Sequence, residues 1–257
     1  MAFAKTRMFS EALGLCVTCD VILPQRADME PNKKLPVLWL LHGAYGNHAD
    51  WTRLTAIERY VRPYGLAVVM PSAQNSCYTD MAHGRKYYTY IAEELPRLMQ
   101  RFYNFSDKRE DNFIAGLSMG GMGSLMIGLA NPEKYSVIGC LSAGLINEEG
   151  SFRQGERFEM TFGDGYTPGT YKDPYGNTRK IVEEGLPCPR VYHACGSEDF
   201  LLNSAHKTRD FFRSFPGDPF GYRYDEDPGA HSWDFWDEHI KRFIEFLNLP
   251  VRQEEYR

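Results

Sequence analysis

The sequence has few cysteines and no excess of positive charge, and each shortage excludes a class of protein. Six cysteines in 257 residues are too few for a disulfide scaffold. No cluster of cysteine and histidine has zinc-finger spacing, so no structural metal is expected. The net charge of −5 provides no broad positive field for phosphate backbones. We therefore expect no nucleic-acid partner.

Long apolar runs are also missing from the start of the chain. Residues 1–25 carry charges of both signs and hold no apolar stretch long enough for a signal peptide or a membrane span. This pattern predicts a cytoplasmic protein with no membrane partner, unless a leader has been removed. The rest of the composition is ordinary, with 43% hydrophobic and 25% charged residues. It predicts one substantial core in a single domain over residues 1–257.

Apolar, strand-like segments alternate with segments of helical spacing along most of the chain. Strands are expected at residues 14–23, 35–41, 65–70, 112–115, 136–141, 190–195 and 220–224. Helices are expected at residues 50–62, with Asp50 as the cap, and at 85–102, 120–129, 203–212 and 232–247. This alternation predicts the α/β class, with a mainly parallel central sheet, helices on both faces and an antiparallel opening. Such a sheet binds ligands at the carboxyl ends of its strands.

The regular alternation stops between residues 145 and 186. This interval is rich in glycine, proline, phenylalanine and tyrosine, and it shows no long amphipathic helix. A long irregular insertion in a compact domain is usually functional or mobile. The sequence therefore predicts a short cap insertion over the site rather than a second domain.

Residues 116–120, Gly-Leu-Ser-Met-Gly, match the G-x-S-x-G pattern. In this pattern a serine occupies a tight strand-to-helix turn, and the flanking glycines let neighbouring backbone approach. The pattern alone is weak, but an apolar strand precedes it, and Gly121 and Gly123 allow the next helix to pack closely. Ser118 is therefore the predicted nucleophile. The alternative is a serine that only caps a helix.

A serine hydroxyl needs a base to take its proton and an acid to orient that base. In this type of site the order along the chain is serine, acid, histidine. His231 is the predicted base because it lies in a loop after the last expected strand, where Gly229 frees the turn. Packing or surface roles are predicted for the other late histidines, which fall inside expected strands or helices: His193, His206 and His239.

The acid should follow the preceding parallel strand. The strand expected at residues 190–195 runs into a loop with Glu198 and Asp199, and Asp199 is the predicted acid. Glu198 stays open as the competitor, because spacing does not rank adjacent loop residues. Asp225 and Asp227 lie too near the base in the chain to fill this role, and we expect them to be solvated loop charges.

Reaction through an acyl-enzyme also needs two backbone N–H groups that face the developing oxyanion. In such sites one belongs to the residue after the nucleophile, here Met119, and the other comes from a loop after an earlier strand. Residues 42–46, His-Gly-Ala-Tyr-Gly, are that loop, with Ala44 as the predicted donor. For His42 we expect a buried side chain that bonds to the loop backbone.

Several residues near these loops are predicted to line a cleft at the carboxyl edge of the sheet. They follow the oxyanion loop, follow a strand end or lie beside the histidine loop: Tyr45, Trp51, Tyr78, Asp80 and Trp233. Aromatic residues in such places are core residues about as often as they contact ligands. The substrate-binding candidates are Tyr45, Tyr78, Asp80 and Trp233.

Five groups of residues together resemble a known family. They are Leu41-His42-Gly43 with Gly46-Asn47, Tyr78-Thr79-Asp80, residues 115–121, residues 196–199 and His231. These motifs and their order resemble those of the esterase D or “putative esterase” family of the α/β-hydrolase fold, particularly the bacterial tributyrin-type esterases. The resemblance spans nearly the whole chain. The resemblance implies a triad of Ser118, Asp199 and His231, with Ala44 and Met119 as the oxyanion hole. It does not extend to the cap, where no motif matches.

The residues and the resemblance predict a serine carboxylesterase that hydrolyses short-chain acyl esters through an acyl-enzyme. It would need no cofactor, and its partner would be a small-molecule ester. The alternatives are a carbohydrate acyl esterase for feruloyl or acetyl groups, an S-formylglutathione hydrolase, and an acyltransferase whose site excludes water. A binding protein that has kept only the fold is a third class, and the intact set of reactive residues argues against it. A homo-oligomer stays open.

Overall fold

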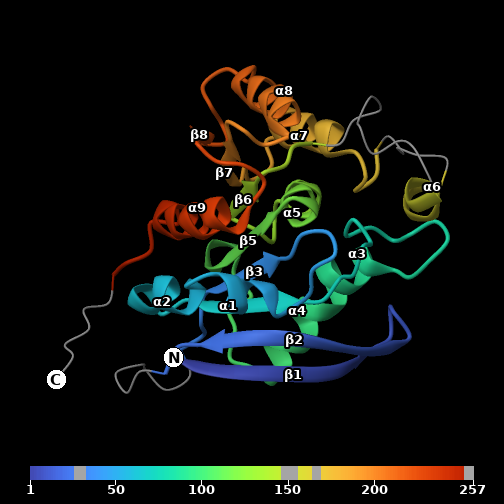
Figure 1. Cartoon of the computed structure of the whole chain (residues 1–257), viewed down its shortest axis with the longest axis vertical. Coiled ribbons are helices and arrows are strands. Elements are labelled where there is room, and N and C mark those ends of the chain that lie inside the picture. The colour runs from blue at the N-terminus through green and yellow to red at the C-terminus, as the bar shows by residue number, and fades with distance from the viewer. Residues whose placement is uncertain (26–32, 146–155, 164–168, 252–257) are drawn as a thin grey trace.

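The computed structural model describes residues 1–25, 33–145, 156–163 and 169–251, and an eight-stranded sheet forms its centre (Figure 1). The spatial order of the strands is β1-β2-β4-β3-β5-β6-β7-β8. The strands are β1 (Ala2–Ser10), β2 (Leu15–Leu23), β3 (Val37–Leu41), β4 (Ala67–Pro71), β5 (Asn112–Leu117), β6 (Val137–Leu141), β7 (Arg190–Gly196) and β8 (Arg223–Asp227).

Strand pairing confirms the predicted α/β class with an antiparallel opening. β2 pairs antiparallel with both β1 and β4, and all the other neighbouring strands pair in parallel. The helices are α1 (Asp50–Leu54), α2 (Ile57–Val61), α3 (Tyr87–Thr89), α4 (Leu95–Phe102), α5 (Met119–Ala130), α6 (Glu156–Phe162), α7 (Pro174–Glu183), α8 (Leu202–Arg213) and α9 (Trp233–Phe246). Two 3₁₀ helices are η1 (Arg62–Tyr64) and η3 (Arg109–Asp111), and η2 (Tyr90–Glu94) is a π-helical turn between α3 and α4.

Helices cover both faces of the sheet because successive strand side chains point to opposite sides. In β3, Val37, Trp39 and Leu41 join an apolar cluster with residues of α4, α5, α7 and α8. Leu38 and Leu40 join a second cluster with residues of α1, α2 and α9. Figure 1 shows these two helical layers on opposite sides of the strands. All five residues of β3 are buried, as expected for a parallel strand covered twice.

The prediction of one helix over residues 50–62 is wrong, because this segment forms two helices, α1 and α2. Ala49 is the N-cap, and Asp50 is the first helical residue rather than the cap. The break follows from tertiary contacts: Thr55 is extended, and the N–H of Ala56 donates to a carboxylate oxygen of Asp237 in α9 at 2.8 Å. The second helix therefore begins where it docks on α9.

The last strand also differs from the expected residues 220–224. Asp218 and Gly221 both have a φ of 46°, and the N–H of Tyr222 donates to the side chain of Asp218 at 2.9 Å, so this segment is a turn. Phe220 is buried and packs edge-on against Phe212 of α8 with ring centroids 5.3 Å apart. The strand begins only at the charged residues that follow, and charge on an edge strand discourages pairing with another chain.

The predicted cap over residues 145–186 is described only in part, since residues 146–155 and 164–168 lie outside the described residues. Its described end is tied to the rest of the molecule. Tyr171 stacks on Tyr88 with ring centroids 3.6 Å apart, and its hydroxyl accepts the N–H of Asp80 at 2.9 Å. Asp173 caps α7 by accepting the N–H of Gly176. None of the described helices combines the length and apolar character needed to cross a membrane.

Candidate active site

Ser118 lies at the turn between β5 and α5, in a backbone conformation that is unusual for a residue with a side chain. Its φ is 51° and its ψ is −119°, and its N–H donates to the carbonyl of Leu141 at 2.8 Å. Glycines leave room for this turn: a Cβ on Gly116 would lie 2.4 Å from the carbonyl oxygen of Gly120. A Cβ on Gly120 would lie 2.5 Å from the carbonyl oxygen of Leu41. The turn presents the serine hydroxyl at the carboxyl edge of the sheet.

Ser118, His231 and Asp199 form an unbroken chain of hydrogen bonds. His231 Nε2 lies 2.9 Å from Ser118 Oγ, and His231 Nδ1 lies 2.8 Å and 3.0 Å from the two carboxylate oxygens of Asp199. A carboxylate only accepts, so Nδ1 donates to Asp199, and the neutral ring can accept the serine proton at Nε2. The arrangement has the geometry expected if Ser118 is the nucleophile, His231 the base and Asp199 the acid.

Asp199 is buried, and its surroundings keep it ionised. Burial alone would raise its pKa, but hydrogen bonds from His231, from the N–H of Leu201 and from the hydroxyl of Ser142 more than offset this effect and lower the pKa below its usual value. The Leu201 N–H lies 2.8 Å from Asp199 Oδ1. A carboxylate held in this way fixes the orientation of the imidazole and stabilises it when it becomes protonated.

The competing acid, Glu198, does not face the histidine. Its side chain is exposed, and its N–H donates to the carbonyl of Gly229 at 2.9 Å. The contact with His231 is made by Asp199 instead. The two loops also pack backbone to backbone, because a Cβ on Gly196 would lie 2.1 Å from the carbonyl oxygen of Gly229. The acid loop and the histidine loop therefore support each other directly.

Sequence reasoning missed two buried residues that contact the predicted acid and base: Ser142 bonds to Asp199, and Trp236 packs against His231. Ser142 is buried directly after β6, and its hydroxyl donates to Asp199 and accepts the indole N–H of Trp236 at 2.9 Å. The Trp236 ring meets the His231 ring edge-on with centroids 4.9 Å apart. The position of Ser142 after a strand end, like that of Ser118, was the signal available in the sequence.

Phe200 is a second residue that sequence reasoning missed. It directly follows Asp199, and its ring centroid lies 4.5 Å from that of His231. Unlike Trp236, Phe200 is largely exposed. An accessible aromatic ring therefore borders the imidazole.

The loop of residues 42–46, which is predicted to supply an oxyanion donor and is called the oxyanion loop below, lies beside Ser118. A Cβ on Gly43 would lie 3.6 Å from the Cβ of Ser118, so the backbone leading to Ala44 passes close to the hydroxyl. His42 is buried and bonds to the loop backbone, as predicted: Nδ1 lies 2.6 Å from the carbonyl oxygen of Gly43, and Nε2 accepts the N–H of Ala73 at 2.9 Å. Burial lowers the pKa of His42, which keeps the ring neutral.

The two predicted donors differ in how the structure places them. Met119 is the first residue of α5, so its N–H lies at the helix N-terminus, where the partial positive charge of the helix favours an anion. Ala44 is half-buried in the loop after β3. These placements suit two N–H groups that converge on an oxygen beside Ser118.

The pocket candidates separate into exposed and buried residues. Tyr45 is 85% exposed, and its N–H donates to the side chain of Asn75 at 2.7 Å. Tyr78 is fully buried, and its hydroxyl donates to the carbonyl of His42 at 2.8 Å. This corrects the prediction that Tyr78 lines the cleft: its ring packs against Gly123 in the core and supports the oxyanion loop.

Asp80 and Trp233 also have structural partners. Both carboxylate oxygens of Asp80 are used by Thr89, one by its N–H at 2.9 Å and the other by its hydroxyl at 2.7 Å. Asp80 therefore holds Thr89, the last residue of α3. Trp233 is half-buried at the start of α9 and meets both Trp51 and Trp236 edge-on. Trp51 is fully buried and donates to the carbonyl of Leu41, so it belongs to the core.

The other late histidines have packing or surface roles, as predicted. His193 is buried, with its ring nitrogens 2.8 Å from the carbonyl oxygen of Ala143 and 2.7 Å from the hydroxyl of Tyr222. His206 pairs with Glu226 at 2.6 Å. None of these contacts involves Ser118.

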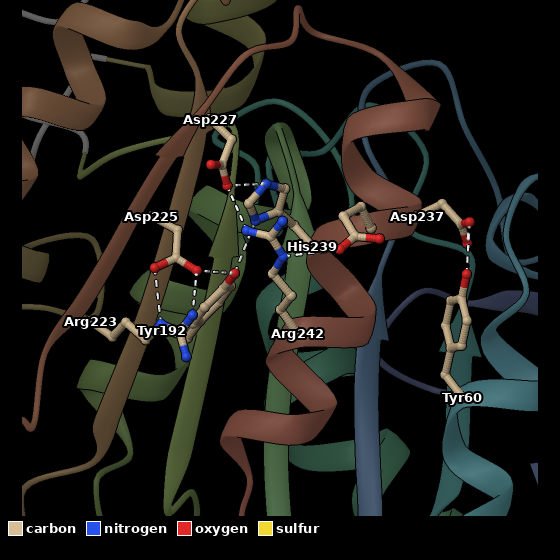
Figure 2. A network of polar contacts seen from close by, with 9 residues as sticks. Tyr60, Tyr192, Arg223, Asp225, Asp227, Asp237, His239 and Arg242 are labelled. Atoms are coloured by element: carbon tan, nitrogen blue, oxygen red, sulfur yellow. Dashed lines mark hydrogen bonds and ion pairs between the residues drawn. The ribbon is translucent and has the colours of Figure 1, made fainter.

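Asp225 and Asp227 correct a further prediction, because they belong to β8 and not to a solvated loop (Figure 2). Asp225 accepts the Tyr192 hydroxyl at 2.9 Å and pairs with Arg223 at 2.8 Å. Asp227 pairs with Arg242 of α9 at 2.6 Å. Asp225 therefore ties β8 to β7, and the Asp227–Arg242 pair ties β8 to α9, on either side of the loop that carries the predicted base.

The chain is similar to known proteins over nearly its whole length. Residues 10–246 match the family described as “Putative esterase”. An acetyl esterase of Caldicellulosiruptor saccharolyticus is 31% identical over 268 aligned residues, which cover 96% of this chain and 98% of the relative. An S-formylglutathione hydrolase of Paracoccus denitrificans (strain Pd 1222) is 27% identical, and the alignment covers 75% of this chain and 74% of that one.

Solved structures give the same picture. The fluorophosphonate-binding serine hydrolase F (FphF) of Staphylococcus aureus, with substrate bound, matches with a TM-score of 0.86 and 32% identity. The match covers 96% of this chain and 98% of that one. The family match over residues 10–246 spans the positions of Ser118, Asp199 and His231.

Proposed function

This chain belongs to the “Putative esterase” family, and we propose that it hydrolyses short-chain acyl esters through an acyl-enzyme formed on Ser118. It is an ester hydrolase of the α/β-hydrolase fold. The observation that carries the assignment of residues is the hydrogen-bond chain from Ser118 through His231 to the buried Asp199. No cofactor enters the proposed reaction.

In the acylation step His231 acts as a general base. Its Nε2 takes the proton from Ser118 as Oγ attacks the acyl carbon, and a tetrahedral intermediate forms. Negative charge then develops on the former carbonyl oxygen, and the N–H groups of Ala44 and Met119 are proposed to stabilise it. The intermediate collapses when the bond to the alcohol oxygen breaks and His231 returns the proton to that oxygen.

In the deacylation step a water molecule replaces the alcohol. His231 takes a proton from the water as its oxygen attacks the acyl carbon, and the bond from that carbon to Ser118 Oγ then breaks. Oγ recovers the proton from His231, and the carboxylic acid leaves. Asp199 stabilises the protonated imidazole in both steps because it is ionised and receives the Nδ1 hydrogen bond.

Short acyl groups are proposed for two reasons. The 31% identical relative is an acetyl esterase, and the buried rings of Tyr78 and Trp51 bond to the backbone of His42 and Leu41 rather than line an acyl pocket. Tyr45 and Trp233 stay the candidates for substrate contact, because both keep exposed surface beside the site loops. The cap over residues 145–186 stays part of the proposal, as does a cytoplasmic location.

An S-formylglutathione hydrolase is the second candidate, since one relative has that name. The same residues would attack a thioester, with the thiol leaving in place of an alcohol. Hydrolysis of feruloyl or acetyl esters of sugars would use the same type of acyl-enzyme with a sugar as the leaving alcohol. Acyl transfer would use it with an alcohol in place of water as the acceptor.

A side-by-side assay separates these candidates. The substrates are p-nitrophenyl esters from acetyl to octanoyl, methyl ferulate, acetylated xylan and S-formylglutathione. We expect kcat/KM to be highest between acetyl and butyryl and to fall at least about tenfold at octanoyl, because an apolar pocket discriminates by methylene count. A value for octanoate equal to that for butyrate would contradict the short-chain proposal, and a value for S-formylglutathione far above all esters would favour the second candidate.

A further inference from the structure

The two most exposed large apolar side chains of the described residues both lie on loops of the active site. Tyr45, on the oxyanion loop, is 85% exposed, and Phe200, on the acid loop, is 74% exposed. An exposed aromatic ring costs free energy through its contact with water, so two such rings at one site indicate a surface that another molecule covers. Phe200 has no role in the reaction as described above.

The backbone holds Phe200 in a defined position. Its chain neighbours Asp199 and Leu201 are both buried, and the N–H of Leu201 donates to Asp199. The Phe200 ring therefore points outward from a fixed turn, and its centroid lies 4.5 Å from that of His231 with the planes tilted by 48°. The other ring against His231 belongs to Trp236, which is buried. Phe200 is thus the neighbour of His231 that a bound ligand can reach.

The chemistry of the reaction decides which part of the substrate lies there. The proton that His231 takes from Ser118 must reach the leaving oxygen, so that oxygen has to come within hydrogen-bond distance of Nε2. The group attached to the leaving oxygen then extends past the imidazole. The acyl group is attached to the carbon that Ser118 attacks and extends away from that proton path.

We propose that Phe200 forms the subsite for the alcohol portion of the substrate and favours esters whose leaving group is aromatic or a bulky apolar alcohol. This inference rests on the proposed function, since it assumes that His231 protonates the leaving group. The ring of Phe200 would stack with an aryl leaving group or cover an apolar one. In hydrolysis the subsite acts only in acylation, because the alcohol has departed before water enters.

The test compares two acetyl esters that differ only in the alcohol. For wild type and Phe200→Ala, kcat/KM is measured with phenyl acetate and with ethyl acetate. We expect the ratio of the two values, phenyl over ethyl, to fall about five- to tenfold in Phe200→Ala, because aromatic pairing is lost only for the aryl ester. Phe200→Tyr should restore the ratio. Methyl ferulate and methyl acetate, which share the alcohol, should keep their wild-type ratio in Phe200→Ala.

A second readout uses the reverse of acylation. With p-nitrophenyl acetate as donor, the acetyl-enzyme is divided between water and an added alcohol. The hydroxyl oxygen of the alcohol attacks the acyl carbon while His231 takes its proton; the bond from that carbon to Ser118 Oγ then breaks, and Oγ recovers the proton from His231. The preference for benzyl alcohol over ethanol as acceptor should fall in Phe200→Ala by a similar factor, because an acceptor enters where the leaving alcohol departs. Phe9→Ala is the matched control, since Phe9 is an exposed phenylalanine on β1.

The outcomes separate this inference from the function on which it rests. An unchanged phenyl-to-ethyl ratio in Phe200→Ala would overturn the inference while hydrolysis through Ser118 stands. An equal fall for both esters would also overturn it, because it would show that Phe200 supports only the acid loop. A change in the ferulate-to-acetate ratio alone would also overturn it, because it would show that the Phe200 ring contacts the acyl group and not the alcohol. Wild-type protein that hydrolyses no ester and takes no fluorophosphonate on Ser118 would refute the proposed function itself.

Discussion

Ser142, at the end of one strand, donates a hydrogen bond to Asp199, the carboxylate that follows the next strand. The same hydroxyl accepts the indole N–H of Trp236, whose ring packs against His231. One buried hydroxyl therefore bonds both to Asp199 and to the ring that packs against His231, and we infer that Ser142 is a positioning residue.

Replacing Ser142 by Ala should lower kcat for p-nitrophenyl acetate by about tenfold or more, because a hydrogen bond to a charged group contributes about 1.5–3 kcal/mol. Loss of this bond should also raise the pKa of Asp199, which then attracts a proton on the imidazole more strongly, so the acid limb of the profile of kcat/KM against pH should move to higher pH. The measurement is a pH series of initial rates for both proteins.

Ser124→Ala is the control for this substitution. Ser124 is also buried, on α5, and its hydroxyl oxygen lies 2.8 Å from the carbonyl oxygen of Gly121 and 2.6 Å from that of Gly139. We expect both variants to lose stability, about 1–3 kcal/mol in urea unfolding, but only Ser142→Ala to lose activity. Equal rates in the two variants would show that Ser142 is an ordinary structural residue.

Substitution of the two adjacent acids should give very different rates. Asp199→Asn should reduce kcat by roughly 10³ to 10⁴, because the amide no longer holds the imidazole in the required tautomer. Glu198→Gln should cost less than about tenfold, since its side chain is exposed and does not contact His231. The reverse ranking in steady-state kinetics would transfer the role of acid to Glu198.

Removal of the nucleophile should nearly abolish turnover. Ser118→Ala should lower kcat by on the order of 10⁴ or more while the protein stays folded, because only binding and oxyanion stabilisation remain. Mass spectrometry after treatment with a fluorophosphonate should place the adduct on Ser118 in the wild type. An adduct on a different serine would remove the basis of the proposal.

Two buried histidines should make the fold sensitive to mild acid. Burial lowers the pKa of His193 and of His239 to about 4, whereas a histidine in an unfolded chain titrates near pH 6.5. Between these values the unfolded state binds protons that the folded state does not. The free energy of unfolding should therefore fall as the pH is lowered from about 6.5 to about 4, by on the order of 1–3 kcal/mol for each histidine.

Urea unfolding at pH 7.5, 6.0 and 5.0 measures this loss. His239→Gln removes one of the two titrating groups, so the free energy of unfolding of this variant should depend less steeply on pH, even if the variant is less stable at pH 7.5. Identical slopes in the variant and the wild type would exclude His239 as a source of the acid sensitivity.

Much of the fold could be predicted because its signals are local in the sequence. The wholly apolar segment of β3 and the glycines around Ser118 are local patterns, and both features were found where expected. β8 was misplaced because its residues are charged, and their partners Tyr192 and Arg242 come from other elements. Contacts of that kind leave no trace in the local pattern.

The same limit applies to the site. The loops of Ser118, Asp199 and His231 could be identified from strand ends and turn residues. Tyr78 looked like a pocket residue because it follows a strand, but its burial depends on close packing against Gly123 of α5. Phe200 was missed for the opposite reason, since an apolar residue in a loop suggests the core until exposure is known.

The close backbone contact of Gly196 with Gly229 joins the acid loop and the histidine loop into one rigid unit. A second contact between the loops is the N–H of Ser197, which donates to the carbonyl of Asp227 at 2.9 Å. A substitution that displaces this unit shifts Asp199 and His231 together. It changes first the 2.9 Å distance from His231 to Ser118, because Ser118 lies on a separate turn. Engineers who wish to transplant or remodel the site should therefore exchange residues 196–201 and 227–231 as one cassette.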